Sequence, residues 1–363
     1  MNRRKGIAVL ALALAMLFTI TPAFSQTQTP APAAGSPSSA PGAASGAGRQ
    51  GGRGGRDSVR RTRSPGPDLG YTYDINPLPL PAGMEYAGHV SSVAINSKGH
   101  IFVLHRAAAS KPQLLEFDQN QKFVRGFGQD MAVRNHSMLI DAQDNIWVTD
   151  QNGGTVTKLS PEGKPLMTIG VRGKQGDWDE AAGVRLLWQP LAIAMAPNGD
   201  LYIGMGHGGE SPAGGAARVL HLDKTGKYIH QWFGNARGPG KFSMVHGIAL
   251  DPKGNVYIAD REEYRIVVYH GDGNFIKTIQ RTNLVCHLMV TKSNELFAAT
   301  GADGQIEKID WDGRVLGSTG LGPGNGVGQF GESCDMAMDS KGDIYVADGA
   351  GGRVAKLMAA KKR

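Results

Sequence analysis

Alternating apolar and polar residues recur six times along the chain, and each copy begins with a polar turn. The turn usually carries Gly or Asn, and the strand after it has an aromatic residue at its second position. The copies are NSKGHIFVL from Asn96, DAQDNIWVTD from Asp141, APNGDLYIGM from Ala196, DPKGNVYIAD from Asp251, TKSNELFAAT from Thr291 and DSKGDIYVAD from Asp339. Successive copies start 45, 55, 55, 40 and 48 residues apart. Repeats of this length built from short strands indicate propeller blades, so the pattern predicts an all-β, six-bladed β-propeller.

The last repeat predicts how the ring closes. Each copy is followed by further alternating segments that complete a four-stranded blade, but the sixth ends after the strand at 353–357. A blade without its outer strand has an open edge, which proteins avoid. The segment 70–80 precedes the first inner strand and has no blade of its own. We expect it to supply the missing outer strand of the last blade.

The region before the propeller predicts export. Residues 1–25 combine a basic start, an apolar run at 7–18 and small residues before Gln26, as in a signal peptide. A retained N-terminal anchor is the alternative. Residues 26–69 form a linker rich in Pro, Ala, Gly and Ser and then in Arg-Gly, which we expect to be disordered. The propeller is assigned to 70–363, secreted or periplasmic, with no membrane span after signal cleavage.

Charge adds little to this prediction. The formal net charge of +7 comes from the leader and the Arg-Gly segment, because residues 70–363 are formally neutral. The basic balance therefore says nothing about partners of the folded domain. We expect no nucleic acid partner, since an Arg-Gly tail on an exported protein is more simply a flexible tether.

Candidate chemistry appears when the six repeats are aligned on their common turn. Five residues before the turn, the positions are Ser91, His136, Leu191, His246, Cys286 and Cys334. Imidazole and thiolate are preferred zinc ligands, and blades 2, 4 and 6 would place His136, His246 and Cys334 around the axis. Cys286 is a further candidate in blade 5. Two alternatives remain open: a disulfide between Cys286 and Cys334, and histidines that only make hydrogen bonds.

Several stretches resemble a known family. Gly-rich linkers ending in Phe, such as GLGPGNGVGQF, resemble those of NHL-repeat propellers. The stretches FGQDMAVRNHSMLIDAQDNIWVTDQNGGTVTKL and FSMVHGIALDPKGNVYIADREEYRIVVY, with the pair His105-Arg106, resemble peptidyl-α-hydroxyglycine α-amidating lyases over about 84–358. The resemblance implies a zinc ion held in the propeller by three histidines. It also implies cleavage of a carbinolamide to a peptide amide and glyoxylate.

The family's site residues carry over only in part. Two zinc ligands fall on His136 and His246, and the third falls on Cys334, where the family has His. The resemblance places the active-site arginine at Arg106. The family's tyrosine is missing, and His207 stands about where it should be. A structural calcium is implied at Asp335, with the carbonyls of Val90 and Met138.

These observations lead to one leading hypothesis and two alternatives. The leading hypothesis is an exported, monomeric, metal-dependent lyase for a small or peptide substrate, with Arg106 binding a carboxylate and His207 acting as base. The alternative for His207 is a mobile loop histidine in a Gly-rich insertion, without a role in catalysis. A non-catalytic propeller that binds a protein or glycan, with a structural metal or disulfide, is the first alternative, and a calcium-dependent lactonase is the second. Other histidines are assigned to turns, surface or packing: His89, His105, His221, His230, His270 and His287.

Overall fold

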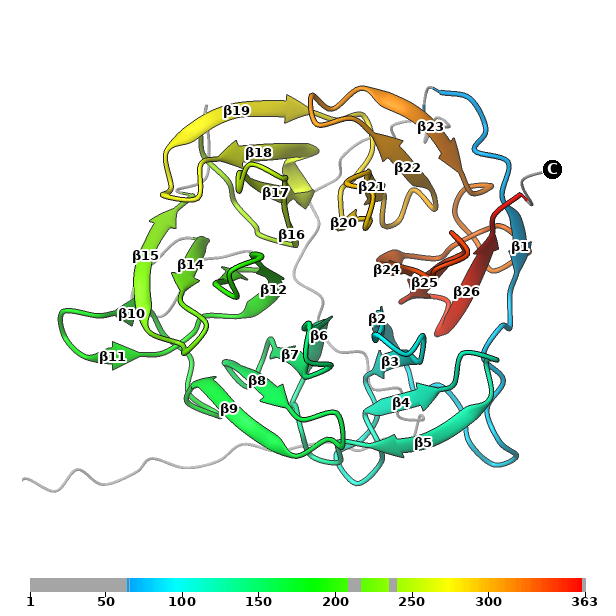
Figure 1. Cartoon of the computed structure of the whole chain (residues 1–363), viewed down its shortest axis with the longest axis horizontal. Coiled ribbons are helices and arrows are strands. Elements are labelled where there is room, and N and C mark those ends of the chain that lie inside the picture. The colour runs from blue at the N-terminus through cyan, green and yellow to red at the C-terminus, as the bar shows by residue number, and fades with distance from the viewer. Residues whose placement is uncertain (1–63, 65, 208–216, 235–239, 361–363) are drawn as a thin grey trace, which may run out of the picture. The chain divides into compact units, whose positions relative to one another are not determined.

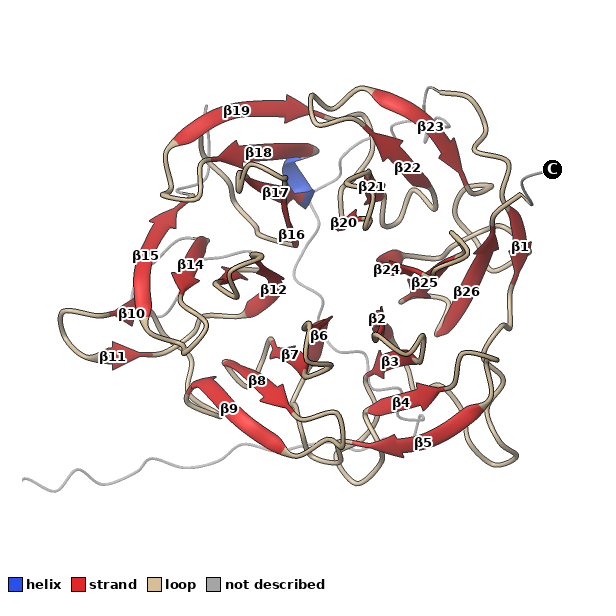
Figure 2. Ribbon diagram, viewed as in Figure 1, coloured by secondary structure: helices blue, strands red, loops and turns tan. Residues whose placement is uncertain are grey.

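The fold is a six-bladed β-propeller, as the repeats predict (Figures 1 and 2). The computed structural model describes residues 64, 66–207, 217–234 and 240–360, all within one compact unit that spans 58–363. The predicted signal peptide and nearly all of the predicted linker lie outside the described residues. Among those described, none lies in a helix long enough to cross a membrane.

Each blade is a four-stranded antiparallel sheet with its first strand nearest the axis (Figure 1). Blade 1 contains β2 (Val90–Ile95), β3 (Ile101–His105), β4 (Leu114–Phe117) and β5 (Phe123–Phe127). Blade 2 contains β6 (Asn135–Ile140), β7 (Ile146–Asp150), β8 (Thr155–Leu159) and β9 (Pro165–Gly170). Blade 3 contains β12 (Pro190–Met195), β13 (Leu201–Met205), β14 (Arg218–Leu222) and β15 (Tyr228–Phe233), after a short hairpin of β10 (Trp178–Asp179) and β11 (Val184–Arg185).

The second half of the ring follows the same order. Blade 4 contains β16 (Gly247–Leu250), β17 (Val256–Asp260), β18 (Arg265–Tyr269) and β19 (Phe275–Gln280), with one 3₁₀ turn at Arg261–Glu263. Blade 5 contains β20 (His287–Val290), β21 (Leu296–Ala299), β22 (Ile306–Ile309) and β23 (Val315–Thr319). Blade 6 contains β24 (Ser333–Met338), β25 (Ile344–Asp348) and β26 (Arg353–Met358), and its outer strand is β1 (Thr72–Asp74).

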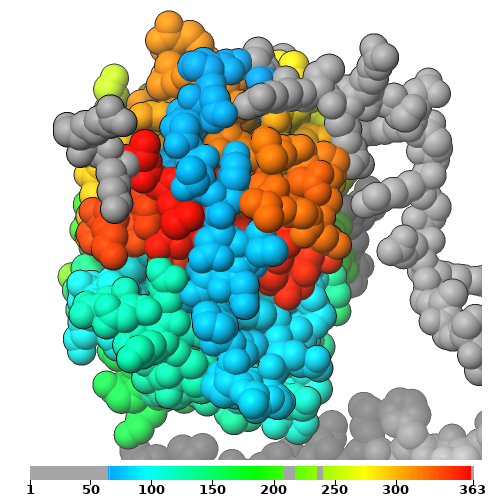
Figure 3. Space-filling model, turned by 90° about the vertical axis from the view of Figure 1, so that its right-hand side faces the viewer, coloured from blue at the N-terminus to red at the C-terminus, as the bar shows by residue number. Residues whose placement is uncertain are grey.

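The pairing of β1 with β26 confirms the predicted closure of the ring. Tyr73 lies opposite Leu357 in this antiparallel pair, and the N-terminal segment runs across the strands of the last blade (Figure 3). Ordered contacts begin before the predicted boundary at residue 70, because Leu69 N donates to Ser318 O at 3.0 Å. One segment from the start of the chain therefore joins blades 5 and 6.

The repeated aromatic residue packs between each blade and the next. Tyr345 of blade 6 packs with Leu115 and Phe117 of blade 1, and Trp147 of blade 2 packs with Ile203 of blade 3. All six aromatic residues are buried: Phe102, Trp147, Tyr202, Tyr257, Phe297 and Tyr345. Burying such side chains between sheets is the main apolar stabilisation of the ring, and it fixes the inner strands around the axis.

Candidate metal centre

Three histidines from three consecutive blades meet near the axis. Ring nitrogens of His136, His207 and His246 all lie within 4.8 Å of one another. The ring centroids of His136 and His246 are 4.8 Å apart, and that of His207 lies 6.2 Å from the first and 5.9 Å from the second. This spacing allows the three imidazoles to hold one metal ion.

Backbone carbonyls of the next blade orient two of these rings. His136 in β6 donates from Nδ1 to Leu191 O at 3.0 Å, and His246, directly before β16, donates from Nδ1 to Cys286 O at 2.9 Å. A carbonyl only accepts, so each ring carries its proton on Nδ1, which leaves Nε2 as the atom with a lone pair; in His246 this lone pair accepts a hydrogen bond from Arg261. Metal-bound histidines are usually fixed in this way.

His207 reaches the group from a loop that leaves the end of β13. Gly206 takes a left-handed conformation at φ 97°, which turns the chain after Met205. The backbone N–H of His207 then donates to Gln189 Oε1 at 2.9 Å, and His207 forms a bridge with Met244 of blade 4. The backbone of His207 is thus held by its own blade and by the segment that leads into blade 4.

The surroundings keep all three rings neutral. Burial, followed by the charge of Arg106, lowers the pKa of His136 well below its ordinary value. Burial and then Arg261 lower the pKa values of both His246 and His207. Neutral imidazole is the form that binds metal, so electrostatics and hydrogen bonding favour the same state.

Two arginines lie beside the histidines. Arg261 donates from Nη1 to His246 Nε2 at 3.2 Å and from Nη2 to Glu332 Oε1 at 2.9 Å. Arg106 donates from Nε to Asn135 O at 3.2 Å, and burial together with Arg134 lowers its pKa to about 10. Both remain charged near neutral pH and make this region favourable for an anion.

The structure places the cysteines differently from the sequence-based hypothesis. Cys334 does not join His136 and His246; its Sγ lies 3.5 Å from His89 Nε2, in a separate group with Glu332. Cys286 is fully buried, and both cysteines are free, so the alternative of a disulfide between them is wrong. The third imidazole beside His136 and His246 is that of His207, which follows the end of β13.

The residues assigned to calcium lie on three inner strands, β2, β6 and β24, and the ion itself stays a prediction. Asp335 Oδ2 accepts from Ser92 Oγ at 2.5 Å, and Ser92 Oγ in turn accepts from Met138 N at 3.1 Å. Asp335 Oδ1 accepts from Met336 N at 2.7 Å and forms an ion pair with His287 Nε2 at 3.0 Å. Calcium takes roughly six to eight oxygen ligands, so an ion here would need the carbonyls of Val90 and Met138 and further oxygens beside the Asp335 carboxylate, and it would compete with the donors that this carboxylate now accepts from.

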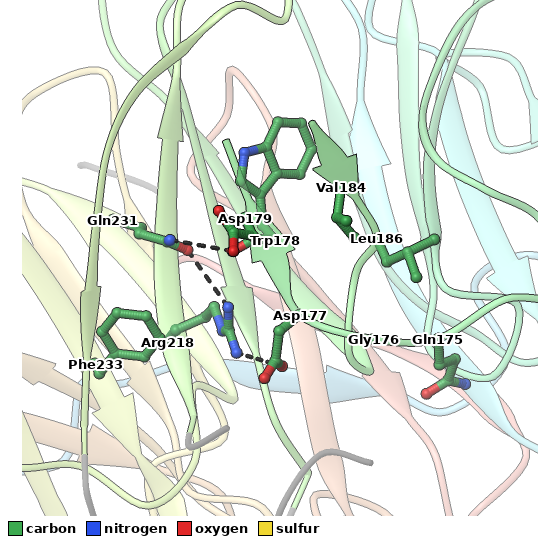
Figure 4. Close-up of a pocket in the computed structure, with 10 residues that line it drawn as sticks. All are labelled: Gln175, Gly176, Asp177, Trp178, Asp179, Val184, Leu186, Arg218, Gln231 and Phe233. Carbon is green, nitrogen blue, oxygen red and sulfur yellow. Dashed lines mark hydrogen bonds and ion pairs between the residues drawn. The ribbon is translucent and has the colours of Figure 1, made fainter. Parts of the chain in front are cut away.

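A pocket lies away from the histidines, on the outside of blade 3 (Figure 4). It has a volume of about 690 Å³ and lies between the β10–β11 hairpin and strands β14 and β15. Buried Arg218 forms an ion pair with Asp177 there, and Gln231 donates to Trp178 O at 3.2 Å. These contacts attach the hairpin to blade 3, which is a structural role.

Sequence reasoning missed His89, Glu332 and Arg261. His89 and Glu332 both lie seven residues before the common turn, two residues before the position that was aligned. Arg261, like Arg106, lies ten residues after the first residue of the turn. Alternate residues of a strand share a face, so extending the same alignment in both directions would have identified these positions.

Comparisons with known proteins find the NHL repeat and a group of similar enzymes. The NHL-repeat family model matches residues 242–269, which contain β16 to β18 and His246. Peptidyl-alpha-hydroxyglycine alpha-amidating lyase 2 of Drosophila melanogaster is 27% identical over 259 residues, 59% of this chain and 60% of that protein. Peptidyl-glycine alpha-amidating monooxygenase of Mus musculus is 28% identical over 227 residues, 54% of this chain and 22% of that protein. The protein is an NHL-type propeller that resembles the amidating lyases.

Solved structures support the fold of this NHL-type propeller. A streptogramin B lyase superimposes with a TM-score of 0.54 at 12% identity, covering 80% of this chain and 98% of the other. A gluconolactonase from Xanthomonas campestris gives a TM-score of 0.57 at 15% identity, covering 76% and 87%. At such low identity the likeness shows the propeller architecture alone. The chain spans less than two thirds of the length of the amidating relatives.

Proposed function

We propose that the protein is an exported, metal-dependent lyase that cleaves peptidyl-α-hydroxyglycine-like carbinolamides into an amide and glyoxylate. The observation that carries the proposal is the neutral group of His136, His207 and His246 beside two arginines. The similarity to an α-hydroxyglycine amidating lyase supplies the substrate class.

The three histidines suit a zinc ion. His136 and His246 carry the proton on Nδ1, which is held by a carbonyl, so Nε2 is the atom that would bind the ion. At His246 the ion would replace the hydrogen bond from Arg261. Three neutral imidazoles with an open fourth position are the donor set of catalytic zinc. When bound, such an ion polarises an oxygen ligand and lowers the pKa of a hydroxyl group. The protein's own contribution is to hold the three rings in fixed tautomers and orientations.

His207 is proposed as the third metal ligand. This replaces the sequence-based hypothesis that His207 acts as the base. Its ring lies with the other two, and one imidazole cannot both bind the metal and take up the substrate proton. Cleavage moves one proton from the hydroxyl oxygen to the amide nitrogen, so the overall reaction neither releases nor consumes a proton.

Arg106 is proposed to bind the substrate carboxylate. Its guanidinium lies near His136, since its charge lowers the pKa of that ring. Its Nε donates to Asn135 O, and within the described residues no other hydrogen bond holds the guanidinium. A planar fork can bind both carboxylate oxygens, which a lysine ammonium cannot. This contact would orient the hydroxyl toward the histidines.

The test is glyoxylate release from a short peptide ending in α-hydroxyglycine, measured with zinc and after chelation. We expect turnover that chelation abolishes and zinc restores. Arg106→Lys should raise KM by about 10- to 100-fold, because a charged hydrogen bond contributes about 1.5–3 kcal/mol. Arg125→Lys, on outer strand β5, is the matched control and should leave KM unchanged. Zinc-loaded protein that releases no glyoxylate would instead favour a non-catalytic propeller with a structural metal.

A further inference from the structure

A second cluster of ligand-type side chains lies where blades 6 and 1 meet. One ligand atom each from His89, Glu332 and Cys334 lies within 4.8 Å of the others, and Cys334 Sγ is 3.5 Å from His89 Nε2. None of these residues belongs to the histidine group proposed above. The cluster combines one nitrogen, one oxygen and one sulfur donor.

The strands bring these donors together in a defined way. Glu332 directly precedes β24 and Cys334 is its second residue, at a register shift between Ser333 and Asp335, and the ligand atoms of the two side chains lie within 4.8 Å of each other. His89 directly precedes β2, and the hydrogen bond from Ser92 to Asp335 ties β2 to β24. Two neighbouring inner strands therefore supply all three donors.

Gly349 leaves the space that the cluster occupies. Its backbone lies outside the left-handed region, so the conformation alone does not require glycine. A Cβ at this position would clash with the His89 ring and lie 2.6 Å from Cys334 Sγ. The equivalent residue of blade 4 is Arg261, whose long side chain fills the corresponding place. The absence of a side chain at 349 thus keeps His89 and Cys334 within reach of each other.

The charges of the cluster match a divalent cation. A carboxylate and a metal-bound thiolate together contribute two negative charges, because a coordinating thiol loses its proton. This balance matters here, since Arg261 contacts Glu332 at 2.9 Å and Arg106 and Arg134 lie close enough to His89 to act on it. The all-histidine group, in contrast, would leave the full charge of an ion unbalanced. The two groups therefore differ in character although they lie in one protein.

We propose that His89, Glu332 and Cys334 form a second metal site, which takes a zinc-class divalent ion through mixed N, O and S ligands. Thiolate and imidazole select such ions over Mg²⁺ and Ca²⁺, and three protein ligands leave one position open. The site shares no ligand with the histidine group, and it does not depend on the reaction proposed for that group.

Cobalt(II) distinguishes the two groups, because a thiolate ligand gives a charge-transfer absorption that imidazole does not. The full-length protein, freed of metal, is titrated with Co²⁺ and followed by absorption and by bound ion per chain. We expect two ions per chain and a thiolate band in the near ultraviolet. Cys334→Ser should lose the band and one ion, whereas Cys286→Ser, the matched control, should keep both. His136→Ala should lose one ion and keep the band.

Further outcomes decide the proposal even if one variant folds poorly by circular dichroism. His89→Gln and Gly349→Ala each perturb the cluster from another side and should also lose the band. A wild-type protein without the band, or a band that survives Cys334→Ser in folded protein, overturns the second site. Glyoxylate release does not enter this readout, so failure of the lyase proposal leaves the result unaffected.

Discussion

Replacing His207 by Ala tests how the three-histidine group is assembled. The change removes only the imidazole: the backbone N–H bond to Gln189 Oε1 and the bridge to Met244 do not involve the side chain. His136 and His246 keep the carbonyl partners that orient them. The variant should therefore fold while holding two ligands in place of three.

The expected magnitude follows from the number of ligands. Four-ligand zinc sites bind with about 10–16 kcal/mol, or about 3 kcal/mol per ligand, so losing one ligand should weaken zinc binding about 100-fold. If His207 were instead the base, zinc affinity would stay near the wild-type value and only turnover would fall.

The assay is zinc affinity measured by competition with a chromophoric chelator, beside thermal unfolding of the same samples. His270→Ala is the control, because His270 is exposed. Within the described part of the chain its ring has one hydrogen-bond partner, Asn255. We expect a large loss of affinity for His207→Ala and none for His270→Ala. An unchanged zinc affinity in folded His207→Ala protein refutes the three-histidine site.

Two further predictions concern stability. Deleting 71–79 removes β1 and buried Leu78, which should cost about 5 kcal/mol and lower the melting temperature by on the order of 10 °C; an unchanged melting temperature contradicts the closure argument. His105 accepts from Ala87 N at Nδ1 and donates from Nε2 to Pro112 O, and burial lowers its pKa below 6.5. The unfolded chain then binds a proton that the folded chain does not. His105 alone should therefore lower the free energy of unfolding as the pH falls below 6.5, by at most about 1.4 kcal/mol per pH unit, until the folded chain binds the proton too. Urea titrations across pH should show a shallower dependence for His105→Gln, and equal slopes would contradict this origin.

The architecture could be predicted from the sequence because each blade repeats the same physical constraint. A polar turn, an alternating strand and an aromatic wedge recur at Trp147, Tyr257 and Tyr345, and each wedge fills the same gap between blades. The missing strand after β26 was also predictable, since an open edge needs a partner. The repetition strengthens the prediction of blades, because the same misinterpretation of the pattern would have to apply to all six copies.

The site could be predicted only where it follows the repeat. His136 and His246 occupy equivalent positions, and their rings lie together in the structure. His207 lies on a loop whose course depends on Gly206 and on a hydrogen bond to Gln189, and neither is visible in a strand pattern. Cys334 was predictable as an axial residue, but not its partners, because side-chain reach rather than repeat position decides which ligands meet.

The arrangement of the two groups follows from which blades carry long side chains near the axis. Blades 2, 3 and 4 supply the three histidines, while blades 6 and 1 supply Cys334, Glu332 and His89 on another part of the ring. Arg261 connects the groups through His246 and Glu332, and glycine at the equivalent positions 301 and 349 leaves room for the cysteines. A cation at Glu332 would compete with Arg261 for the carboxylate, so occupation of one group should alter the hydrogen bonding of the other. The propeller thus departs from its six-fold pattern at the few positions where long polar side chains meet.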